Sequence, residues 1–169
     1  MLRRGFTVVE IIITITIMGI LLTLAVVSLS ASQINSRDTE RKGDVEALAT
    51  HLETFYRAGS ETSTVVGRYP STAITADEAT LRSALRDVDI KSVTAPGVSS
   101  MTATFRPANN TNQTTAGVTP QPTLSQYVYQ PLQSDNSLCT VETQECRKFN
   151  LYYRLESDNT VYMVTSKNQ

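Results

Sequence analysis

The chain opens with a long apolar stretch. From Phe6 to Val27 there are 22 residues with one charge, Glu10, and no proline. At about 1.5 Å per residue, a helix of this length reaches roughly 33 Å, which is enough to cross a hydrocarbon core of about 30 Å. The β-branched residues would favour a strand in water, but a single strand in lipid leaves its backbone N–H and C=O groups unpaired. We therefore expect a membrane-spanning helix over residues 6–30.

Glu10 is the unusual residue of this stretch. A carboxylate at the centre of a membrane span costs about 2.5–3.5 kcal/mol on insertion scales, so an intramembrane acid indicates a functional site and needs a partner. Cleavage of the chain after Gly5 would give Phe6 a new α-amine one helical turn from this carboxylate. That amine is the nearest positive group that the sequence offers, on the same chain or on a neighbouring one.

The polar and apolar pattern changes after the span, but nothing in it ends the helix. Residues 35–44 mix three acids with three bases, and no proline occurs before Pro70. One face then carries apolar residues at steps of three, four and three, namely Val45, Leu48, Leu52 and Phe55. This spacing predicts an amphipathic continuation of the helix over residues 31–58, packed on a small domain and ended by Gly59.

Residues 59–169 show the pattern of a small mixed domain. A Thr75-x-x-Glu78 sequence has the form of a capping box and predicts a short helix over residues 75–88. Alternating positions then predict strands at about 98–106, 126–131, 148–156 and 160–165, and the last two are joined by a turn. Residues 107–123 are rich in Asn, Thr, Gln and Pro and indicate an exposed loop. The expected fold is α+β, with an antiparallel sheet against the outer half of the helix.

Charge and cysteines fix the expected orientation. Lys and Arg number 15 and Asp and Glu 16, which gives no general reason to expect nucleic-acid binding. Arg3 and Arg4 precede the span, so the positive-inside rule places the N-terminus in the cytoplasm and the remainder outside. In that oxidising compartment a disulfide between Cys139 and Cys146 is favoured, and a metal-binding pair or two free thiols are the alternatives.

The segment Gly5-Phe6-Thr7-Val8-Val9-Glu10, behind a short basic leader, closely resembles the class III signal of type IV pilins and of type II secretion pseudopilins. This resemblance implies that prepilin peptidase removes a leader of residues 1–5 by cutting between Gly5 and Phe6, and that Phe6 is N-methylated. It implies that Glu10 neutralises the N-terminus of an adjacent subunit during assembly. It also implies the pilin fold.

The implied partners are further copies of the chain and other pilins, the peptidase, and an inner-membrane assembly platform. The implied location is the cytoplasmic membrane for the single-pass precursor, followed by a pilus at the cell surface. In such a filament the mixed charges of residues 37–44 either form a solvated collar or pair between subunits. An ordinary secretory signal or a plain signal anchor would leave Glu10 unexplained.

Three functions remain open at this point. A pilus subunit, major or minor, would serve adhesion, motility or DNA uptake, and the polar loop and the cysteine-closed loop favour it. A pseudopilin of a type II secretion-like system is favoured by the segment Gly67-Arg68-Tyr69-Pro70. A tip adhesin or DNA receptor would depend on a small group of aromatic and basic residues, namely Tyr152, Tyr153, Arg154, Arg147 and Lys148.

The sequence shows no catalytic constellation, and we expect neither an enzyme nor a cofactor. His51 is the single histidine. Calcium binding would require a group of acids near the end of the chain, but without EF-hand spacing these acids are expected to be solvated: Asp135, Glu142, Glu145 and Asp158. Many pilins have a proline in the second half of the span. Here Gly19 is the candidate position at which the helix would loosen.

Overall fold

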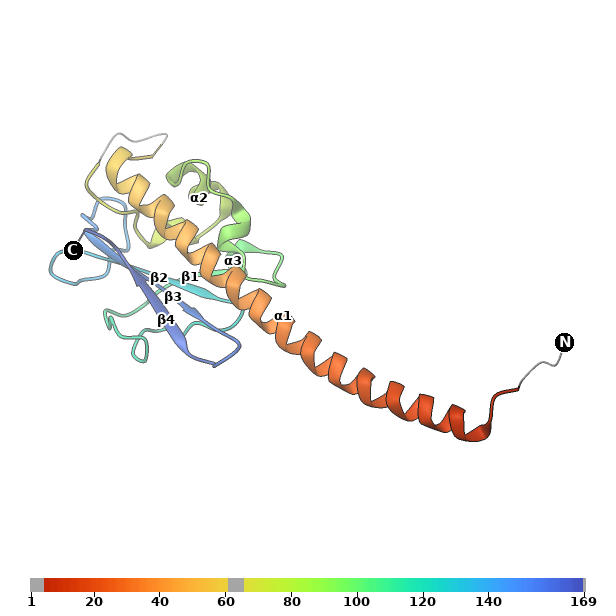
Figure 1. Ribbon diagram of the computed structural model, residues 1–169. Coiled ribbons are helices and arrows are strands. Elements are labelled where there is room, and N and C mark those ends of the chain that lie inside the picture. Colours follow the sequence, from red (N-terminus) through yellow and green to blue (C-terminus); the bar gives the residue numbers. More distant parts are fainter. Residues whose placement is uncertain (1–4, 61–65, 169) are drawn as a thin grey trace. The chain divides into compact units, whose positions relative to one another are not determined.

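The computed structural model describes residues 5–60 and 66–168, apart from the side chain of Ala103. Arg3 and Arg4 of the expected leader lie outside the described residues. Figure 1 shows the elements in chain order. They are α1 (Val8–Ala58), η1 (Thr72–Thr75), α2 (Glu78–Ala84), η2 (Ile90–Val93), α3 (Met101–Thr104), β1 (Phe105–Pro107), β2 (Tyr127–Leu132), β3 (Lys148–Arg154) and β4 (Val161–Thr165). The chain divides into two units, residues 1–36 and residues 37–169.

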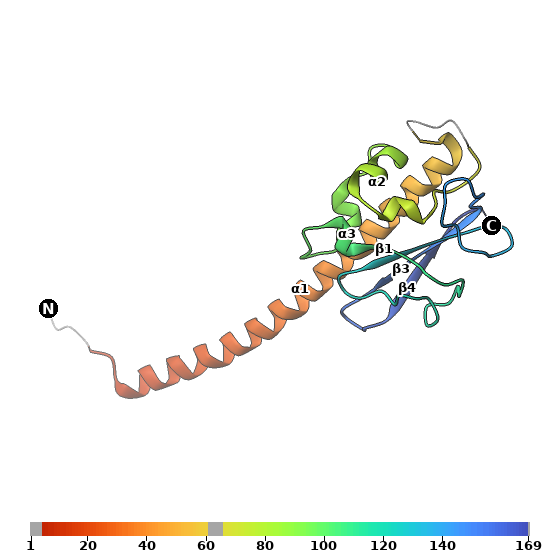
Figure 2. The same cartoon turned by 180° about the vertical axis from the view of Figure 1, so that it is seen from behind.

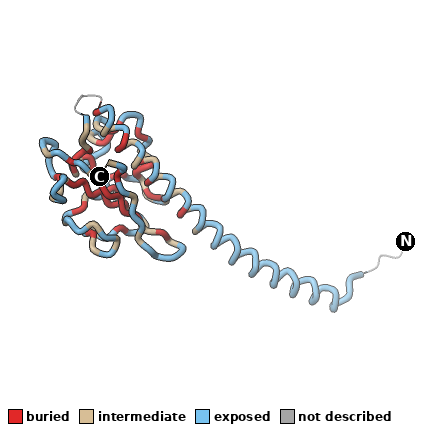
Figure 3. Tube along the Cα trace, turned by 60° about the vertical axis from the view of Figure 1, so that its left-hand side comes forward, coloured by how far each residue is buried: buried red, intermediate tan, exposed pale blue. Residues whose placement is uncertain are grey.

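In the first unit, α1 is continuous through Gly19, and its residues from Val8 to Gln33 are all exposed (Figure 3). The hydroxyls of Thr14, Thr16, Thr23 and Ser30 each donate a hydrogen bond to a carbonyl three or four residues earlier. All of these polar groups are therefore satisfied within the helix, as an apolar environment requires.

In the second unit, residues 37–58 of α1 pack against one face of the sheet (Figures 1 and 2). Val45, Leu48 and Leu52 are fully buried, as the three-four-three spacing predicts. Their neighbours in the core include Tyr129 and Phe149 from β2 and β3. The long helix against a small sheet confirms the expected α+β architecture.

The sheet is mixed rather than purely antiparallel. Its strand order is β1-β2-β3-β4, and β2, β3 and β4 are antiparallel neighbours. β1 pairs with β2 in parallel, with Phe105 opposite Tyr127. Adjacent parallel strands need a connection of a dozen or more residues. The long polar loop between Pro107 and Tyr127 supplies it.

The prediction of a strand over residues 98–106 was largely wrong. Met101–Thr104 form a helical turn, and only Phe105–Pro107 are a strand. Met101 and Phe105 are both buried. Their spacing of four residues fits one face of a helical turn as well as alternate positions of a strand, so the period alone did not separate the two.

The predicted capping box at residues 75–78 was also wrong. Thr75 lies at the end of η1, and its hydroxyl donates to the Thr72 carbonyl. Asp77 is the residue that caps α2, because its carboxylate accepts a hydrogen bond of 2.7 Å from the Thr80 N–H. The helix is consequently shorter than the predicted range of residues 75–88.

The loop over residues 107–123 is less exposed than its composition indicates. The fully buried Gln130 donates from Nε2 to the carbonyls of Asn110 and Asn112, at 2.8 and 3.0 Å. Its Oε1 accepts hydrogen bonds from Asn150 and Tyr152. The amide of one β2 residue therefore anchors this loop to the sheet.

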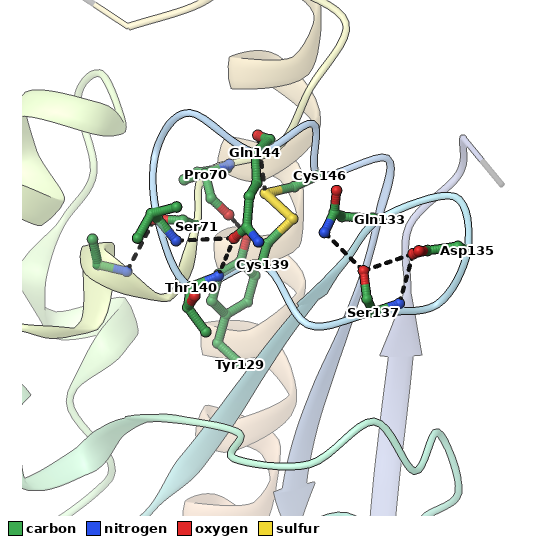
Figure 4. Close-up of a disulfide and its surroundings, with 12 residues drawn as sticks. Pro70, Ser71, Tyr129, Gln133, Asp135, Ser137, Cys139, Thr140, Gln144 and Cys146 are labelled. Atoms are coloured by element: carbon green, nitrogen blue, oxygen red, sulfur yellow. Dashed lines mark hydrogen bonds between the residues drawn. A yellow bond between two sulfur atoms is a disulfide. The ribbon is translucent and has the colours of Figure 1, made fainter.

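Cys139 and Cys146 form a disulfide with a Cα–Cα distance of 5.8 Å (Figure 4). The loop that they close also holds the segment that follows α1. The Tyr69 N–H donates to the Cys146 carbonyl at 2.8 Å, and the Thr72 N–H donates to the Cys139 carbonyl at 3.0 Å. The loop that the disulfide closes after β2 is thus hydrogen-bonded to the segment after α1.

Candidate assembly site at the start of the first helix

Thr7 and Glu10 define where α1 begins. The Glu10 N–H donates to Thr7 Oγ1 at 3.2 Å, and the Thr7 N–H donates to Glu10 Oε2 at 3.0 Å. This reciprocal pair is a capping box, which satisfies two of the backbone donors that a helix start leaves unpaired. The Thr-x-x-Glu pattern that signals it is present in the sequence, but we had not identified Thr7 as a cap from it.

The cap also orients the carboxylate of Glu10. Thr7 Oγ1 donates a second hydrogen bond to the same oxygen, Oε2, at 2.9 Å. Within residues 5–60 and 66–168, Glu10 Oε1 accepts no hydrogen bond and forms no ion pair. One oxygen is therefore used within the chain, and the other remains available.

Gly5 and Phe6 precede the helix in an exposed segment without regular secondary structure. A Cβ added at Gly5 would meet no atom within 4 Å, so the fold itself does not require glycine there. The Phe6 side chain is 83% exposed. The proposed cleavage position is therefore accessible and lies directly before the capped turn.

From Glu10 to Val27, the helix carries no further charged residue and is predominantly apolar. By length and composition, the described residues contain one helix able to cross a membrane, and none of its most apolar window is buried. Sixteen apolar side chains between Phe6 and Leu29 are at least about half exposed. Such a surface is stable in lipid or against other apolar helices, because water contact is unfavourable for all of it.

The mixed charges after the span are engaged within the second unit rather than solvated. Asp38 and Arg41 are buried, with Arg41 Nη1 2.8 Å from Asp38 Oδ1. Asp38 also accepts the N–H groups of Glu156 and Ser157, at 2.8 and 2.9 Å. Arg37 forms a bidentate pair with the Glu156 carboxylate. The expectation of a solvated collar was wrong for these residues, because the β3–β4 turn covers them.

This network sets the charge state of Asp38, which lies outside the span. Burial raises the pKa of its carboxyl group, whereas hydrogen bonds from the Glu156 and Ser157 N–H groups and from Arg41 lower it. The result is a pKa below the ordinary value of aspartate. Asp38 is therefore held as a carboxylate that fixes the turn against α1.

The candidate calcium ligands do not converge. Asp135 accepts from Ser137, Glu145 pairs with Arg147, and Asp158 accepts from Tyr162. The described part of the chain holds no group of three or more acidic, histidine or cysteine side chains placed to bind a metal ion.

The small group of residues considered for DNA binding is also unsuitable for stacking. Tyr152 is fully buried, and its hydroxyl donates to Gln130. Tyr153 is 8% exposed. Arg154 is bound to the Pro122 and Asn159 carbonyls. An aromatic side chain must be exposed to stack on a base, so these two tyrosines cannot serve that purpose.

Comparison with known proteins identifies the N-terminal segment. Residues 1–26 match the model of a family described as the prokaryotic N-terminal methylation motif. No curated protein and no solved structure matches the chain.

Proposed function

The chain carries the class III prepilin signal of type IV pilins and pseudopilins, and from this premise we propose that it is a structural subunit of a type IV pilus. Prepilin peptidase would cut between Gly5 and Phe6 and methylate the new terminus. The subunit would then polymerise through α1. The observation that supports this most directly is Glu10, the one acid at the start of an exposed helix that carries no other charge before Arg37.

The energetic basis of assembly is the exposed surface of the span. In the bilayer, lipid covers the apolar side chains between Phe6 and Leu29. When a subunit leaves the bilayer, the spans of neighbouring subunits replace that cover. The helices then form the apolar centre of the filament, and the units of residues 37–169 form its outer layer.

Glu10 would set the position of one subunit relative to the next. Its Oε2 is held by Thr7. Its Oε1 would accept a charge-assisted hydrogen bond from the methylated amine of Phe6 of a neighbouring subunit. An unpaired charge in an apolar centre is strongly unfavourable, whereas a paired one is tolerated. Only a subunit that brings its amine to this carboxylate is therefore incorporated.

The proposed location follows from the same features. The precursor would sit in the cytoplasmic membrane with its N-terminus in the cytoplasm, where it meets the peptidase and the assembly platform. The mature subunit would be exposed at the cell surface. The disulfide Cys139–Cys146 supports an oxidising compartment for the second unit.

A pseudopilin of a type II secretion-like system is the second candidate. Gly67 has a φ of +80°, a conformation that favours glycine, and it precedes the buried Tyr69. The loop that contains Gly67 and Tyr69 resembles the corresponding loop of major pseudopilins. The polar loop ordered by Gln130 favours the pilus, because it presents a defined surface rather than a flexible one.

The test is the variant Glu10→Ala. Its precursor should insert into the membrane and be processed, but the yield of sheared surface filaments should fall at least tenfold. Glu142→Ala is the matched control, because Glu142 is an exposed acid of the second unit. Wild-type filament yield from Glu10→Ala would refute the role of Glu10. Filaments found only beneath the outer surface would favour the pseudopilin.

A further inference from the structure

β4 is the last strand of the sheet, and no other strand of the described residues pairs with its outer edge. The ladder with β3 shows which backbone groups point outward. The Ser166 N–H donates to the Phe149 carbonyl, and the Thr160 carbonyl accepts from the Leu155 N–H. Backbone groups alternate along a strand, so the N–H and C=O groups of Val161, Met163 and Thr165 point away from β3.

The sequence does nothing to protect this edge. Exposed edge strands usually carry charges, proline or a bulge that prevents pairing with another chain. Val161–Thr165 contain no charged residue, no glycine and no proline. Tyr162 and Met163 are each 37% exposed. The opposite edge differs, because β1 is three residues long and ends at Pro107.

There is also room beside the strand. A groove of about 270 Å³ lies between α1 and β4 and is lined by residues of both, including Ala49 and Thr50 from α1 and Val164 and Thr165 from β4. A second strand placed along β4 would have this space on the α1 side. The edge is therefore sterically open as well as unpaired.

We propose that β4 pairs in antiparallel fashion with β4 of a second copy of this chain, with Met163 opposite Met163. In this register Val161 of each copy faces Thr165 of the other. The three outward residues of each strand then make about six backbone hydrogen bonds across the contact. The pairing goes beyond the proposed assembly through α1, because it uses only the second unit.

Charge complementarity supports a second copy as the occupant. The register extends past the strand ends so that Lys167 of one copy approaches the turn at Asp158 and Asn159 of the other. Lys167 is exposed, and its ammonium group makes no ion pair within the described residues. Asp158 is exposed, and its pKa is lowered by hydrogen bonds from Tyr162 and Thr160, so it is a carboxylate at neutral pH. The two-fold symmetry of the contact gives this attraction twice.

The pairing is small by the standards of stable interfaces, which bury at least about 1,000 Å². Filaments that lie side by side raise the effective concentration of the two copies and compensate for this. The contact is isologous, so it closes on itself and produces pairs rather than an extending chain.

The experiment uses the full chain purified in detergent, where the orientation of the two copies is unconstrained. Met163→Cys is treated with a short bis-maleimide, and Ala116→Cys, an exposed loop position, is the control. We expect at least tenfold more cross-linked dimer at position 163. Equal cross-linking at the two positions would overturn the proposal.

A charge exchange tests the register. Met163→Lys alone and Met163→Glu alone each place like charges face to face, so each variant should form at least tenfold less dimer. Pairing is measured by energy transfer between fluorophores attached to a cysteine introduced by Ala116→Cys. Co-expression of the two variants should restore pairing, because Lys then faces Glu. Retained pairing in either single variant, or no restoration in the mixture, would contradict the proposed register.

Folding is controlled in the same samples. The disulfide Cys139–Cys146 must remain intact in each variant, and Val161→Glu mixed with Thr165→Lys provides a second matched pair on the same strand.

The Glu10→Ala chain should still pair through β4. Loss of filaments with retained pairing, or the reverse, therefore separates this inference from the proposed function.

Discussion

Thr7 and Glu10 bind each other reciprocally at the first turn of α1, each through its side chain and its backbone N–H. The cap places the only carboxylate of the span at a fixed point, directly after the proposed cleavage position. The Glu10 side chain therefore caps the start of the helix on its own chain and has one oxygen left for a neighbouring chain.

Thr7→Val should weaken this cap, because valine keeps the shape of threonine but cannot donate to Glu10 or accept from it. Loss of a threonine cap costs about 1 kcal/mol of helix stability. Hydrogen exchange of the backbone amides of residues 8–10, in detergent, should rise roughly fivefold. Thr7→Ser keeps the hydroxyl and should retain wild-type protection. Unchanged protection in the valine variant would show that the cap does not form.

Gly5→Ser should prevent processing without affecting the fold. Space around Gly5 is open, so a serine side chain meets no steric conflict within the chain. The precursor should accumulate at full length in the membrane, and its mass should include residues 1–5. Ser32→Ala, an exposed position beyond the span, serves as the control and should be processed normally. Normal cleavage of the Gly5→Ser chain would contradict the assigned site.

Asp38→Ala should destabilise the second unit by about 3 kcal/mol, because the buried Arg41 loses its carboxylate partner at 2.8 Å and keeps only Glu156 Oε2 at 3.6 Å. It also frees two backbone N–H groups of the β3–β4 turn. Thermal unfolding of the full chain in detergent measures the effect. Glu78→Ala removes an exposed ion pair to Arg82 and should change stability by less than about 0.5 kcal/mol.

Asp44 should make the second unit less stable as pH rises from about 4 to 7. It lies well beyond the span, and burial raises its pKa to about 6, opposed by a hydrogen bond from the Tyr127 hydroxyl. A folded-state pKa above the unfolded value means that the neutral form is favoured by folding, so this contribution is lost as pH passes through 6. Asp44→Asn should therefore raise stability at pH 7.5 by on the order of 1 kcal/mol after solvent screening. A variant less stable than wild type at pH 7.5 would contradict this sign.

Replacing Cys139 and Cys146 together by serine should cost about 2.5 kcal/mol, as expected for opening a short covalent loop. The segment at Tyr69 and Thr72 would lose the fixed partners of its backbone hydrogen bonds. Limited proteolysis should cut this segment in the double variant and spare it in the wild-type protein. Equal resistance in both would show that the hydrogen bonds alone hold it.

The sequence predicted the parts of the fold that depend on local period. The long apolar helix was predicted from length and apolarity alone, and the core face of α1 from the spacing of Val45, Leu48 and Leu52. The antiparallel strands β2, β3 and β4 followed from alternation and from the turn after Arg154. The spacing of apolar residues and the turn residues are local features, so a single sequence is enough to detect them.

What the sequence did not predict depends on contacts between distant residues. The parallel pairing of β1 with β2 requires a long crossover, which composition presented only as a polar loop. Gln130 and Asp38 are buried polar residues, and most of their hydrogen-bond partners lie 18 to 119 positions away along the chain. No local pattern distinguishes such residues from solvated ones. The Thr7 cap is different, because its motif was present and was overlooked beside the role expected of Glu10.

The measurement that tests the central proposal most directly is the intact mass of the subunit in filaments sheared from cells that express the wild-type chain. We predict a subunit that begins at Phe6, carries one N-terminal methyl group and contains the disulfide. A chain that retains Met1 to Gly5 and is found only as a monomer in the membrane would contradict the account.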